Sequence, residues 1–338
     1  MVRYIRQTAA LAVILLFVCF PAHSFSPEAP VATPAEISVS VNGKHLEYAY
    51  PKTTPAGRVI VNYMSICNAF NASFDWDPHE YKLTYRKGRG NVSMFLDAPS
   101  AILNDNLIAT DQAMIQSDGS LYVPLRFLAE SFGALVEWEG KTNTVNITTA
   151  PVVFFGDSLT EAFELQYFFA TSPVSFINLG FNGITTAGAL EKLDRVIASH
   201  PSEIYIMLGT NDIWGGIEDD VIMSNYSGIL DVLGYGCPFA AITIQSILPM
   251  SSERMSFNRN VSLEKINRLN SLLLAEAEMR RYEYADIGEK LSDPFTGALK
   301  PDYTTDGIHL SRTAYMKWSE LLKTLTDAGF PASGGGFW

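Results

Sequence analysis

From residue 152 to residue 287 the chain alternates short apolar runs with longer stretches of helical periodicity. The apolar runs, which we predict to be strands, are residues 152–155, 174–178, 204–208, 240–244 and 284–287. The stretches between them, such as residues 186–199 and 263–281, have the spacing of amphipathic helices. Strands and helices in alternation form a parallel sheet with helices on both faces and right-handed crossovers. This part of the chain is therefore predicted to be an α/β domain with its site at the carboxyl ends of the strands.

Three polar motifs follow the first three predicted strands, and a fourth lies just before a closing helix expected to start near Leu310. Their sequences are FFGDSLT at 154–160, NLGFNGIT at 178–185, LGTNDIW at 208–214 and DGIH at 306–309. Taken alone, the first motif fits an ordinary helix cap, and the second and third fit ordinary turns. Because all four occur in order at the ends of successive elements, they favour one shared site.

Ser158, Asp306 and His309 have the residue types of a nucleophile that is activated by a base. Ser158 lies between an apolar strand and a helix, where the N–H groups of the first helical turn stabilise negative charge. A serine hydroxyl is a weak nucleophile until a base removes its proton, and an imidazole base needs a carboxylate on its other nitrogen. Two residues separate Asp306 from His309, so a tight turn can bring their side chains together. His200 has no such neighbour and is interpreted as a helix-terminal residue.

The four motifs together resemble the SGNH hydrolase family, also called GDSL-type hydrolases, over about residues 151–328. The residues that carry the family's motifs here are Ser158, Gly183, Asn211, Asp306 and His309. The resemblance implies a flavodoxin-like three-layer parallel sheet and a carboxylic ester hydrolase that works through an acyl-enzyme. It also implies Ser158 as the nucleophile, His309 as the base and Asp306 as the carboxylate that orients it. No metal or organic cofactor is implied.

The resemblance further implies an oxyanion hole made by the Ser158 N–H, the Gly183 N–H and the Asn211 side chain. The second motif departs from the family pattern, because Ile184 follows Gly183 where relatives often have Asp. Gly180, in the same motif, is a competing donor, since the sequence does not fix the register of the loop. The Gly-x-Ser-x-Gly elbow of the α/β-hydrolases is absent from the sequence, which argues against that other serine-hydrolase fold.

The resemblance implies the type of reaction, ester hydrolysis, but it leaves several classes of substrate open. Within the resembled family, compact secreted members often remove acetyl or other short acyl groups from carbohydrates. A cell-wall or extracellular glycan ester is therefore the first expectation. The alternatives are a lysophospholipid or thioester substrate, or a non-catalytic wall-binding protein that retains the fold. Trp214 and the loop 245–260, with Met250 and Met255, are expected either to line the site or to pack in the core.

Residues 37–148 contain an internal repeat with a period of 62 positions. The coinciding pairs include Gly57 with Gly119, Phe70 with Phe132 and Trp76 with Trp138. Each copy is predicted to contain a strand, an amphipathic helix (62–71 and 124–133), a strand that bears the tryptophan, and a last strand (82–85 and 144–147). The two tryptophans are interpreted as core residues rather than as sugar-stacking ones.

The second copy resembles the copper amine oxidase N-terminal-like domain, through YVPLRFLAESFGA at 122–134 and VEWEGKTNTV at 136–145. The resemblance covers about residues 37–148 and implies a small α+β module that is found beside many secreted bacterial enzymes. It is no evidence for copper, because His45 and His79 occupy unmatched positions of the two copies and are interpreted as surface residues. We expect the module to contact the cell wall.

The N-terminal residues have the order of a signal peptide. Arg3 and Arg6 precede an apolar run over residues 9–20, and Ala22 and Ser24 follow as small residues. We expect cleavage after residue 24 and a secreted or cell-envelope location. The apolar run is shorter than the roughly 20 residues that cross a bilayer, and no later stretch is longer, so no membrane span is expected after cleavage.

The remaining segments and the composition exclude other classes. Residues 25–36 are rich in proline and are predicted to be an extended tether, and residues 329–338 are predicted to be a flexible tail. The formal net charge is −12 and no basic stripe offsets it, which argues against a nucleic-acid partner.

Cys67 and Cys237 fall in different predicted domains and are interpreted as buried apolar side chains. No histidines or cysteines have metal-ligand spacing.

Overall fold

The structure is a computed structural model in which residues 36–327 are described. The predicted signal peptide (1–24), the predicted tail (329–338) and nearly all of the predicted tether (25–36) lie outside the described residues. The N-terminal and C-terminal domains are treated separately below.

The C-terminal domain is built on a five-stranded sheet in which every strand pairing is parallel. Its strands are β14 (Val152–Gly156), β15 (Phe176–Gly180), β16 (Glu203–Met207), β17 (Ala241–Gln245) and β18 (Glu283–Ala285). Their order is β15-β14-β16-β17-β18. The second strand, β15, lies on one side of β14, and the later strands are added on its other side, so the strand order reverses at β14. In open parallel sheets a crevice forms at the carboxyl end of the strand where this reversal occurs. The predicted α/β domain is confirmed, and its reversal point lies directly before Ser158.

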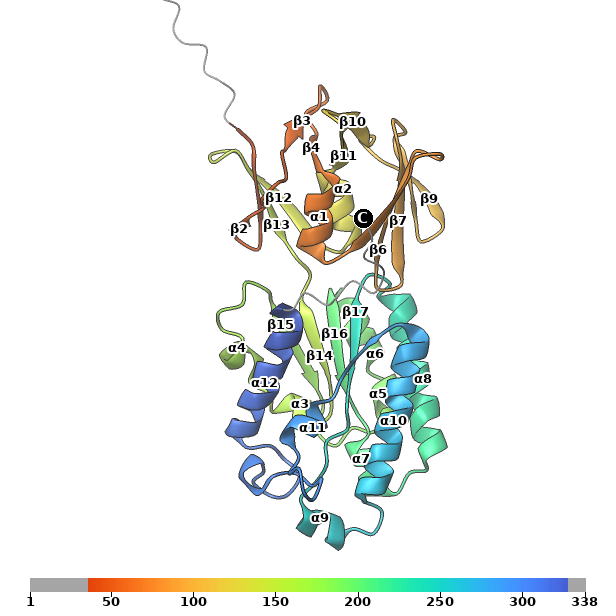
Figure 1. Ribbon diagram of the computed structural model, residues 1–338, viewed down its shortest axis with the longest axis vertical. Coiled ribbons are helices and arrows are strands. Elements are labelled where there is room, and N and C mark those ends of the chain that lie inside the picture. The colour runs from red at the N-terminus through yellow and green to blue at the C-terminus, as the bar shows by residue number, and fades with distance from the viewer. Residues whose placement is uncertain (1–35, 328–338) are drawn as a thin grey trace, which may run out of the picture. The chain divides into compact units, whose positions relative to one another are not determined.

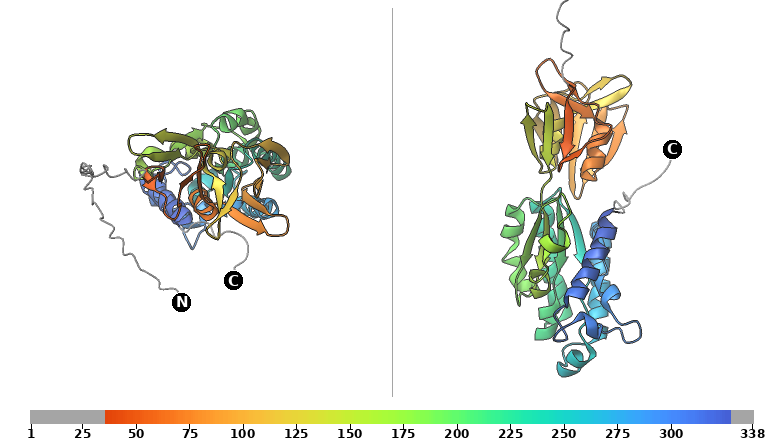
Figure 2. Two further views of the ribbon diagram at one scale, coloured as in Figure 1. Left: turned by 90° about the horizontal axis from the view of Figure 1, so that it is seen from above. Right: turned by 90° about the vertical axis from the view of Figure 1, so that its left-hand side faces the viewer.

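Alternating side chains of the strands pack into two separate cores. Val153 and Phe155 of β14 join one core, and Phe154 joins the other. The first core contains side chains of α5, α6, α8 and α10, and the second contains side chains of α3, α4, α11 and α12. In the right-hand view of Figure 2 the dark-blue α12 and the green helices lie on opposite sides of this sheet. Helices therefore cover both faces, as the near-continuous apolar strands require.

The helices of this domain follow the predicted pattern with two differences, and one predicted strand is shorter than expected. They are α3 (Ser158–Glu161), α4 (Leu165–Phe168), α5 (Thr186–Leu190), α6 (Leu193–Ala198), α7 (Thr210–Gly215), α8 (Asp219–Gly236), α9 (Ser252–Phe257), α10 (Leu263–Arg280), α11 (Ile287–Leu291), the 3-10 helix η1 (Pro301–Tyr303) and α12 (Arg312–Asp327). The helix predicted over 186–199 is divided into α5 and α6. The loop predicted over 245–260 contains α9. Strand β18 ends at Ala285, because Asp286 caps α11: its Oδ1 accepts a hydrogen bond from the Glu289 N–H.

The N-terminal domain is rich in strands, with a helix in each copy of the repeat (Figure 1). Its sheets have the orders β12-β13-β1-β2, β10-β11-β4-β3 and β5-β6-β7-β8-β9. The elements are β1 (Ser38–Val41), β2 (Lys44–His45), β3 (Lys52–Thr53), β4 (Val59–Asn62), α1 (Tyr63–Phe70), β5 (Ser73–Asp77), β6 (Lys82–Lys87), β7 (Gly90–Phe95), β8 (Ser100–Leu103), β9 (Asn106–Ala109), β10 (Ile115–Ser117), β11 (Ser120–Pro124), α2 (Leu125–Ser131), β12 (Leu135–Glu139) and β13 (Thr144–Thr148).

The repeat is visible in these elements. Strand, helix, tryptophan-bearing strand and last strand follow one another as β4-α1-β5-β6 and again as β11-α2-β12-β13. Helix α1 begins where the Asn62 side chain accepts a hydrogen bond from the Met64 N–H, and it ends where Asn71 adopts a left-handed conformation. The second copy has Pro124 at the corresponding start, as predicted.

The interpretation of both tryptophans as core residues is wrong for Trp138. Trp76 packs against the core of the domain, but the side chain of Trp138 is 48% exposed. Strand β12 is at the edge of its sheet, and Val136 is its buried residue. Trp138 lies near the end of this edge strand, so the core extends over only part of its ring.

The histidines and cysteines outside the C-terminal motifs occupy ordinary positions. His45 and His79 are exposed, as interpreted from the sequence. Cys67 and Cys237 are free and buried, and desolvation raises the pKa of their thiols to about 12 and about 11. Within residues 36–327, no helix combines the length and the apolar character that a membrane crossing requires.

Candidate active site

Ser158 is the first residue of α3, directly after the carboxyl end of β14. Asp157 caps the helix, because its Oδ1 accepts a hydrogen bond from the Leu159 N–H at 2.9 Å. A Cβ on Gly156 would lie 2.1 Å from the Thr160 hydroxyl and 2.5 Å from the Met207 carbonyl oxygen, so only glycine fits there. The Gly-Asp-Ser motif therefore combines a close approach of strands, a helix cap and a serine at the helix N-terminus.

The structure brings together the three residues that the sequence predicted as a unit. The Ser158 Oγ lies 3.1 Å from His309 Nε2, and His309 Nδ1 lies 2.7 Å from Asp306 Oδ2. With the Nδ1 proton donated to Asp306, Nε2 is free to accept the proton of Ser158. The side chains of His309 and Asp306 are 46% and 41% exposed, so a substrate can reach them.

Asp306 is held in the ionised form by its surroundings. Desolvation alone would raise its pKa, but hydrogen bonds from the His309 ring and from the N–H groups of Ile308 and His309 outweigh it, and the pKa falls to about 2. The two backbone bonds to Oδ1 measure 2.9 and 2.8 Å. Asp306 thus carries a full negative charge beside the imidazole at neutral pH.

The turn from Asp306 to His309 is fixed from both sides. Gly307 has a left-handed φ of +89°, its N–H donates to the Thr304 hydroxyl, and that hydroxyl donates to the His309 carbonyl oxygen. The Ser251 N–H, at the start of α9, donates to the Gly307 carbonyl oxygen at 2.9 Å. Helix α9, which the sequence did not predict, therefore supports the turn that carries the histidine.

Two of the three expected oxyanion donors point to no acceptor in the described part of the chain. Neither the Ser158 N–H nor the Gly183 N–H has a hydrogen-bond partner among residues 36–327. Gly183 has a φ of +71°, which suits glycine. The competing Gly180 N–H donates to Asn178 Oδ1, and a Cβ on Gly180 would lie 2.1 Å from the Glu161 N. Gly180 therefore packs against α3 and is not free to donate to a ligand.

The third expected donor, Asn211, lies in the first turn of α7. Its side-chain amide donates one N–H to the Ile184 carbonyl oxygen at 2.9 Å, which fixes the amide against the loop that carries Gly183. An amide NH₂ has two donors, so the second N–H stays available. The expected donors thus come from the three segments that directly follow β14, β15 and β16, two of them from first helical turns and one from a loop.

Asp212 is a supporting residue that sequence reasoning missed. Its buried carboxylate accepts hydrogen bonds from the Thr186 hydroxyl at 2.6 Å and from the Thr186 N–H at 3.0 Å. These bonds tie the start of α5 to α7 and so fix the loop between β15 and α5. The Asn-Asp pair after β16 was the available signal, but a polar doublet after a strand is also ordinary turn chemistry.

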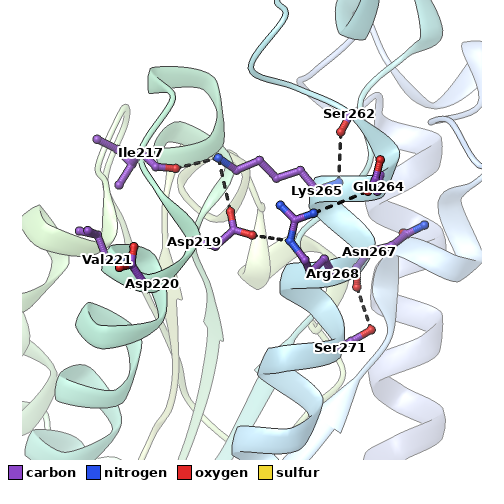
Figure 3. Close-up of polar contacts among 10 residues, drawn as sticks. All are labelled: Ile217, Asp219, Asp220, Val221, Ser262, Glu264, Lys265, Asn267, Arg268 and Ser271. Atoms are coloured by element: carbon purple, nitrogen blue, oxygen red, sulfur yellow. Dashed lines mark hydrogen bonds and ion pairs between the residues drawn. The ribbon is translucent and has the colours of Figure 1, made fainter.

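The segment after α7 is anchored to α10 by a charge cluster (Figure 3). Lys265 donates to the Ile217 carbonyl oxygen at 2.7 Å and pairs with Asp219 at 3.4 Å. Asp219 also accepts a hydrogen bond from Arg268 at 2.6 Å. Because Ile217 lies two residues after the end of α7, this cluster fixes the helix that carries Asn211.

Trp214, Met250 and Met255, which were expected either near the site or in the core, lie in the core or pack against it. Met250 is 2% exposed and belongs to the core, and Met255 packs against that core. Trp214 is partly buried, its carbonyl oxygen accepts a hydrogen bond from the Asn258 side chain at 3.0 Å, and its ring lies under the Arg254 guanidinium. No group of three or more potential metal ligands occurs in the portion of the chain described.

The site places a serine, a histidine and a carboxylate in hydrogen-bond contact at a strand end of an α/β domain, which is the arrangement that serine hydrolases use. Residues 154–317 match the GDSL-like Lipase/Acylhydrolase family, and residues 40–147 match the copper amine oxidase N-terminal domain. The C-terminal domain therefore belongs to a family of carboxylic ester hydrolases, and the N-terminal domain belongs to the copper amine oxidase N-terminal family. Both predicted family assignments are confirmed.

Similar proteins were found among curated and solved ones. An N-acylneuraminate cytidylyltransferase of Streptococcus agalactiae is 26% identical over 194 residues, which cover 55% of this chain and 43% of that protein. The chain thus spans less than half the length of this relative. A Streptococcus pneumonia protein described as a "platelet activating factor" is 31% identical, over 54% of this chain and 85% of that one, with a TM-score of 0.47. A GDSL-like lipase of Bacteroides thetaiotaomicron is 24% identical, over 54% and 89%, with a TM-score of 0.47.

Proposed function

We propose that the protein is a secreted serine esterase that removes acetyl or other short acyl groups from a cell-wall or extracellular glycan. The observation that carries the esterase chemistry is the 3.1 Å contact between Ser158 Oγ and the imidazole, with the imidazole paired to Asp306 at 2.7 Å. We interpret the C-terminal domain as the flavodoxin-like three-layer form of the fold, in which such a site lies at the strand-order reversal.

In the first half of the reaction, Ser158 Oγ attacks the ester carbonyl carbon while His309 Nε2 takes the hydroxyl proton. The carbonyl oxygen becomes an anion, and the Ser158 N–H, the Gly183 N–H and the Asn211 amide donate hydrogen bonds to it. The C–O bond to the alcohol then breaks, and His309 gives its proton to the leaving alcohol. The product is an ester between Ser158 and the acyl group.

In the second half, water attacks the acyl-enzyme. His309 takes a proton from the water as its oxygen bonds to the acyl carbon, and the same oxyanion donors act again. The bond to Ser158 then breaks, the serine recovers its proton from His309, and a carboxylic acid leaves. Asp306 stays ionised throughout, because its pKa of about 2 lies far below that of an imidazolium.

Export and the glycan substrate rest on the organisation of the chain. Arg3, Arg6 and the apolar run that follows them support a signal peptide, and the copper amine oxidase N-terminal domain supports a surface role. A short acyl group on a carbohydrate is the ester that such an enzyme would meet outside the cell.

The test uses the full chain and chromogenic esters. We expect wild type to hydrolyse 4-nitrophenyl acetate, and Ser158→Ala to lose activity by about 10⁴-fold or more, because the nucleophile is removed. Equal rates for the two proteins would remove Ser158 from its role, and no turnover by either would favour a wall-binding protein without activity. Comparing acetyl with octanoyl esters separates the glycan proposal from a lipid substrate, since a lysophospholipase prefers the longer chain.

A further inference from the structure

A cavity of about 780 Å³ opens beside the turn that carries the imidazole. Asp306 and Gly307 form one part of its wall, and side chains of α9 and of the turn 293–297 form others. Neither the expected oxyanion donors nor Ser158 and His309 line it, so Asp306 is its contact with the three residues of the site. The cavity therefore lies on the Asp306 side of the site rather than on the side of the oxyanion donors.

The chemistry assigns the two sides of an ester to different places. The carbonyl oxygen must face the oxyanion donors, whereas the leaving oxygen must face His309, which protonates it. Since Asp306 and Gly307 belong to the same turn as His309, we expect a long group attached to the leaving oxygen to extend past the imidazole to this cavity. We propose that the cavity binds the sugar residues of the leaving alcohol, and that it selects glycans without charge. This inference rests on the proposed function, and it names where and by what the glycan is held.

Arg254 supplies a hydrogen-bond donor in the cavity wall. Its Nε is buried and has no hydrogen-bond partner among the described residues, and its guanidinium lies over the Trp214 ring at 5.4 Å from the ring centre. Buried donors normally have a partner, because an unsatisfied one costs about 1–3 kcal/mol. Arg254 also lines the cavity, where the other N–H groups of its guanidinium can donate to a sugar oxygen. The stacked ring and the contact with Gly307 keep the arginine stem in one place.

One exposed phenyl ring lines the cavity, and a second belongs to the turn 293–297, two residues of which line it. Phe257, at the end of α9, lines the cavity and is 79% exposed, and Phe295 is 94% exposed. Phe295 lies between Asp293 and Thr296, which also line the cavity, and its N–H donates to Asp293 Oδ1. Exposed large apolar side chains beside a polar cavity mark binding surfaces, and the C–H faces of sugar rings pack on aromatic rings. The wall thus combines stacking surfaces with hydroxyl and guanidinium groups.

The charges of the wall favour a neutral ligand. Glu253, Asp293 and Asp306 place three carboxylates around one guanidinium, that of Arg254. Hydrogen bonds from Thr296 and Phe295 lower the pKa of Asp293, and Asp306 has a pKa of about 2, so both are ionised at neutral pH. An anionic glycan would meet a net negative wall, whereas a neutral one keeps the stacking and the hydrogen bond.

The experiment compares three substrates on the full chain. These are neutral O-acetylated xylo-oligosaccharides, anionic O-acetylated oligogalacturonides and 4-nitrophenyl acetate. The variants are Phe257→Ala and Arg254→Met, the second of which keeps the packed methylene stem. The control is Tyr235→Ala, because Tyr235 is 82% exposed but lies at the end of α8 that leads into the amino end of β17.

We expect wild type to prefer the neutral glycan to the anionic one at least tenfold in kcat/KM at low salt. We expect the ratio of kcat/KM for the neutral glycan to that for 4-nitrophenyl acetate to fall at least fivefold in both variants, and to stay unchanged in the control. An unchanged ratio in the variants, or a preference for the anionic glycan, would overturn the inference but leave the esterase proposal standing. Turnover of 4-nitrophenyl acetate without turnover of either glycan would overturn both the inference and the glycan part of the proposed function.

Discussion

Asp306 is expected to orient the His309 ring through its charge, and it also accepts hydrogen bonds that stabilise its own turn. A substitution by asparagine separates these two roles. In Asp306→Asn the amide oxygen can still accept the Ile308 and His309 N–H bonds, but the side chain no longer carries the charge that pairs with the ring. We therefore expect kcat for 4-nitrophenyl acetate to fall by about 10⁴-fold, while the melting temperature at pH 7 changes little. Steady-state kinetics with thermal unfolding checks this. A loss below tenfold would show that His309 does not depend on Asp306.

Asp157 makes stability depend on pH in a direction opposite to that of most acids. Burial raises its pKa from 3.8 to about 6, because the desolvation of the carboxyl group outweighs the hydrogen bond from the Leu159 N–H, which lowers the pKa. The folded state thus binds a proton that the unfolded state releases between about pH 4 and pH 6. Stability is lost as the pH rises through this window, by up to about 3 kcal/mol.

The variant Asp157→Asn tests this linkage, because the amide oxygen can keep the cap to Leu159 without a charge. We expect the free energy of unfolding of wild type, relative to the variant, to decrease between pH 4 and pH 6 and then to stay constant up to pH 8. Urea titrations at these pH values measure it. A difference between the two proteins that does not change with pH would mean that Asp157 titrates normally in the folded state.

The contact among Ser158, His309 and Asp306 could be predicted from the sequence, because each residue lies in a short motif at the end of an element. Asp212 could not, because its partner Thr186 is 26 positions away and only the fold brings them together. The exposure of Trp138 was also beyond the sequence, since alternation along a strand predicts its face but not how far the core extends beneath it.

At the scale of elements, the turn between η1 and α12 depends on one glycine. Gly307 has a φ of +89°, and a Cβ there would lie 2.6 Å from the Ser251 hydroxyl and 2.8 Å from Arg254 Cγ. Gly307→Ala therefore strains the backbone by about 1–2 kcal/mol and displaces α9 from the turn. We expect kcat for 4-nitrophenyl acetate to fall by about 10- to 100-fold, because His309 moves relative to Ser158.

The matched control for this prediction is Gly57→Ala in the N-terminal domain. Gly57 also has a positive φ, of +73°, but no atom lies within 4 Å of the added Cβ. It should show the backbone cost in thermal unfolding without any change in kcat. If Gly307→Ala retains wild-type kcat, then the turn tolerates the displacement and α9 does not support the site.

The periodicity of apolar residues predicts which residues of a helix are buried but does not predict where one helix ends and the next begins. Ala189, Leu193 and Val196 are all buried on one face, although the chain changes from α5 to α6 between them. Bonds to the third preceding residue, such as that from the Lys192 N–H to the Ala189 carbonyl oxygen, keep the apolar spacing through the break. Helix α9 buries none of its residues, so it had no apolar pattern to detect.

At the scale of the whole molecule, the repeat and the change from strand-rich to alternating sequence predict two domains of different class. Both patterns extend over many residues, which makes the prediction robust to local error. The sequence of the N-terminal domain does not predict its binding partner in the same way, because we find no catalytic motif in it. Its partner has to be identified by a binding experiment.

We predict that the full chain with Ser158→Ala, which cannot cleave its substrate, sediments with insoluble purified cell wall. Trp138, 48% exposed, lines a small cavity of about 130 Å³ with Arg126 and Asp111, which makes it the aromatic contact that we expect to bind. Adding Trp138→Ala should lower the bound fraction at least threefold, whereas adding Tyr81→Ala, with Tyr81 57% exposed in the same domain, should not.

The net charge of the chain predicts whether added salt raises or lowers the fraction of protein bound to the cell wall. The chain has a formal net charge of −12, so it is repelled by the anionic polymers of a cell wall, and added salt screens that repulsion. Raising the NaCl concentration from about 0.02 to about 0.3 M should therefore leave the bound fraction unchanged or increase it. A bound fraction that falls steeply with salt would point to attraction by local basic groups, and a soluble fraction that contains all of the protein at every salt concentration would end the wall-contact hypothesis.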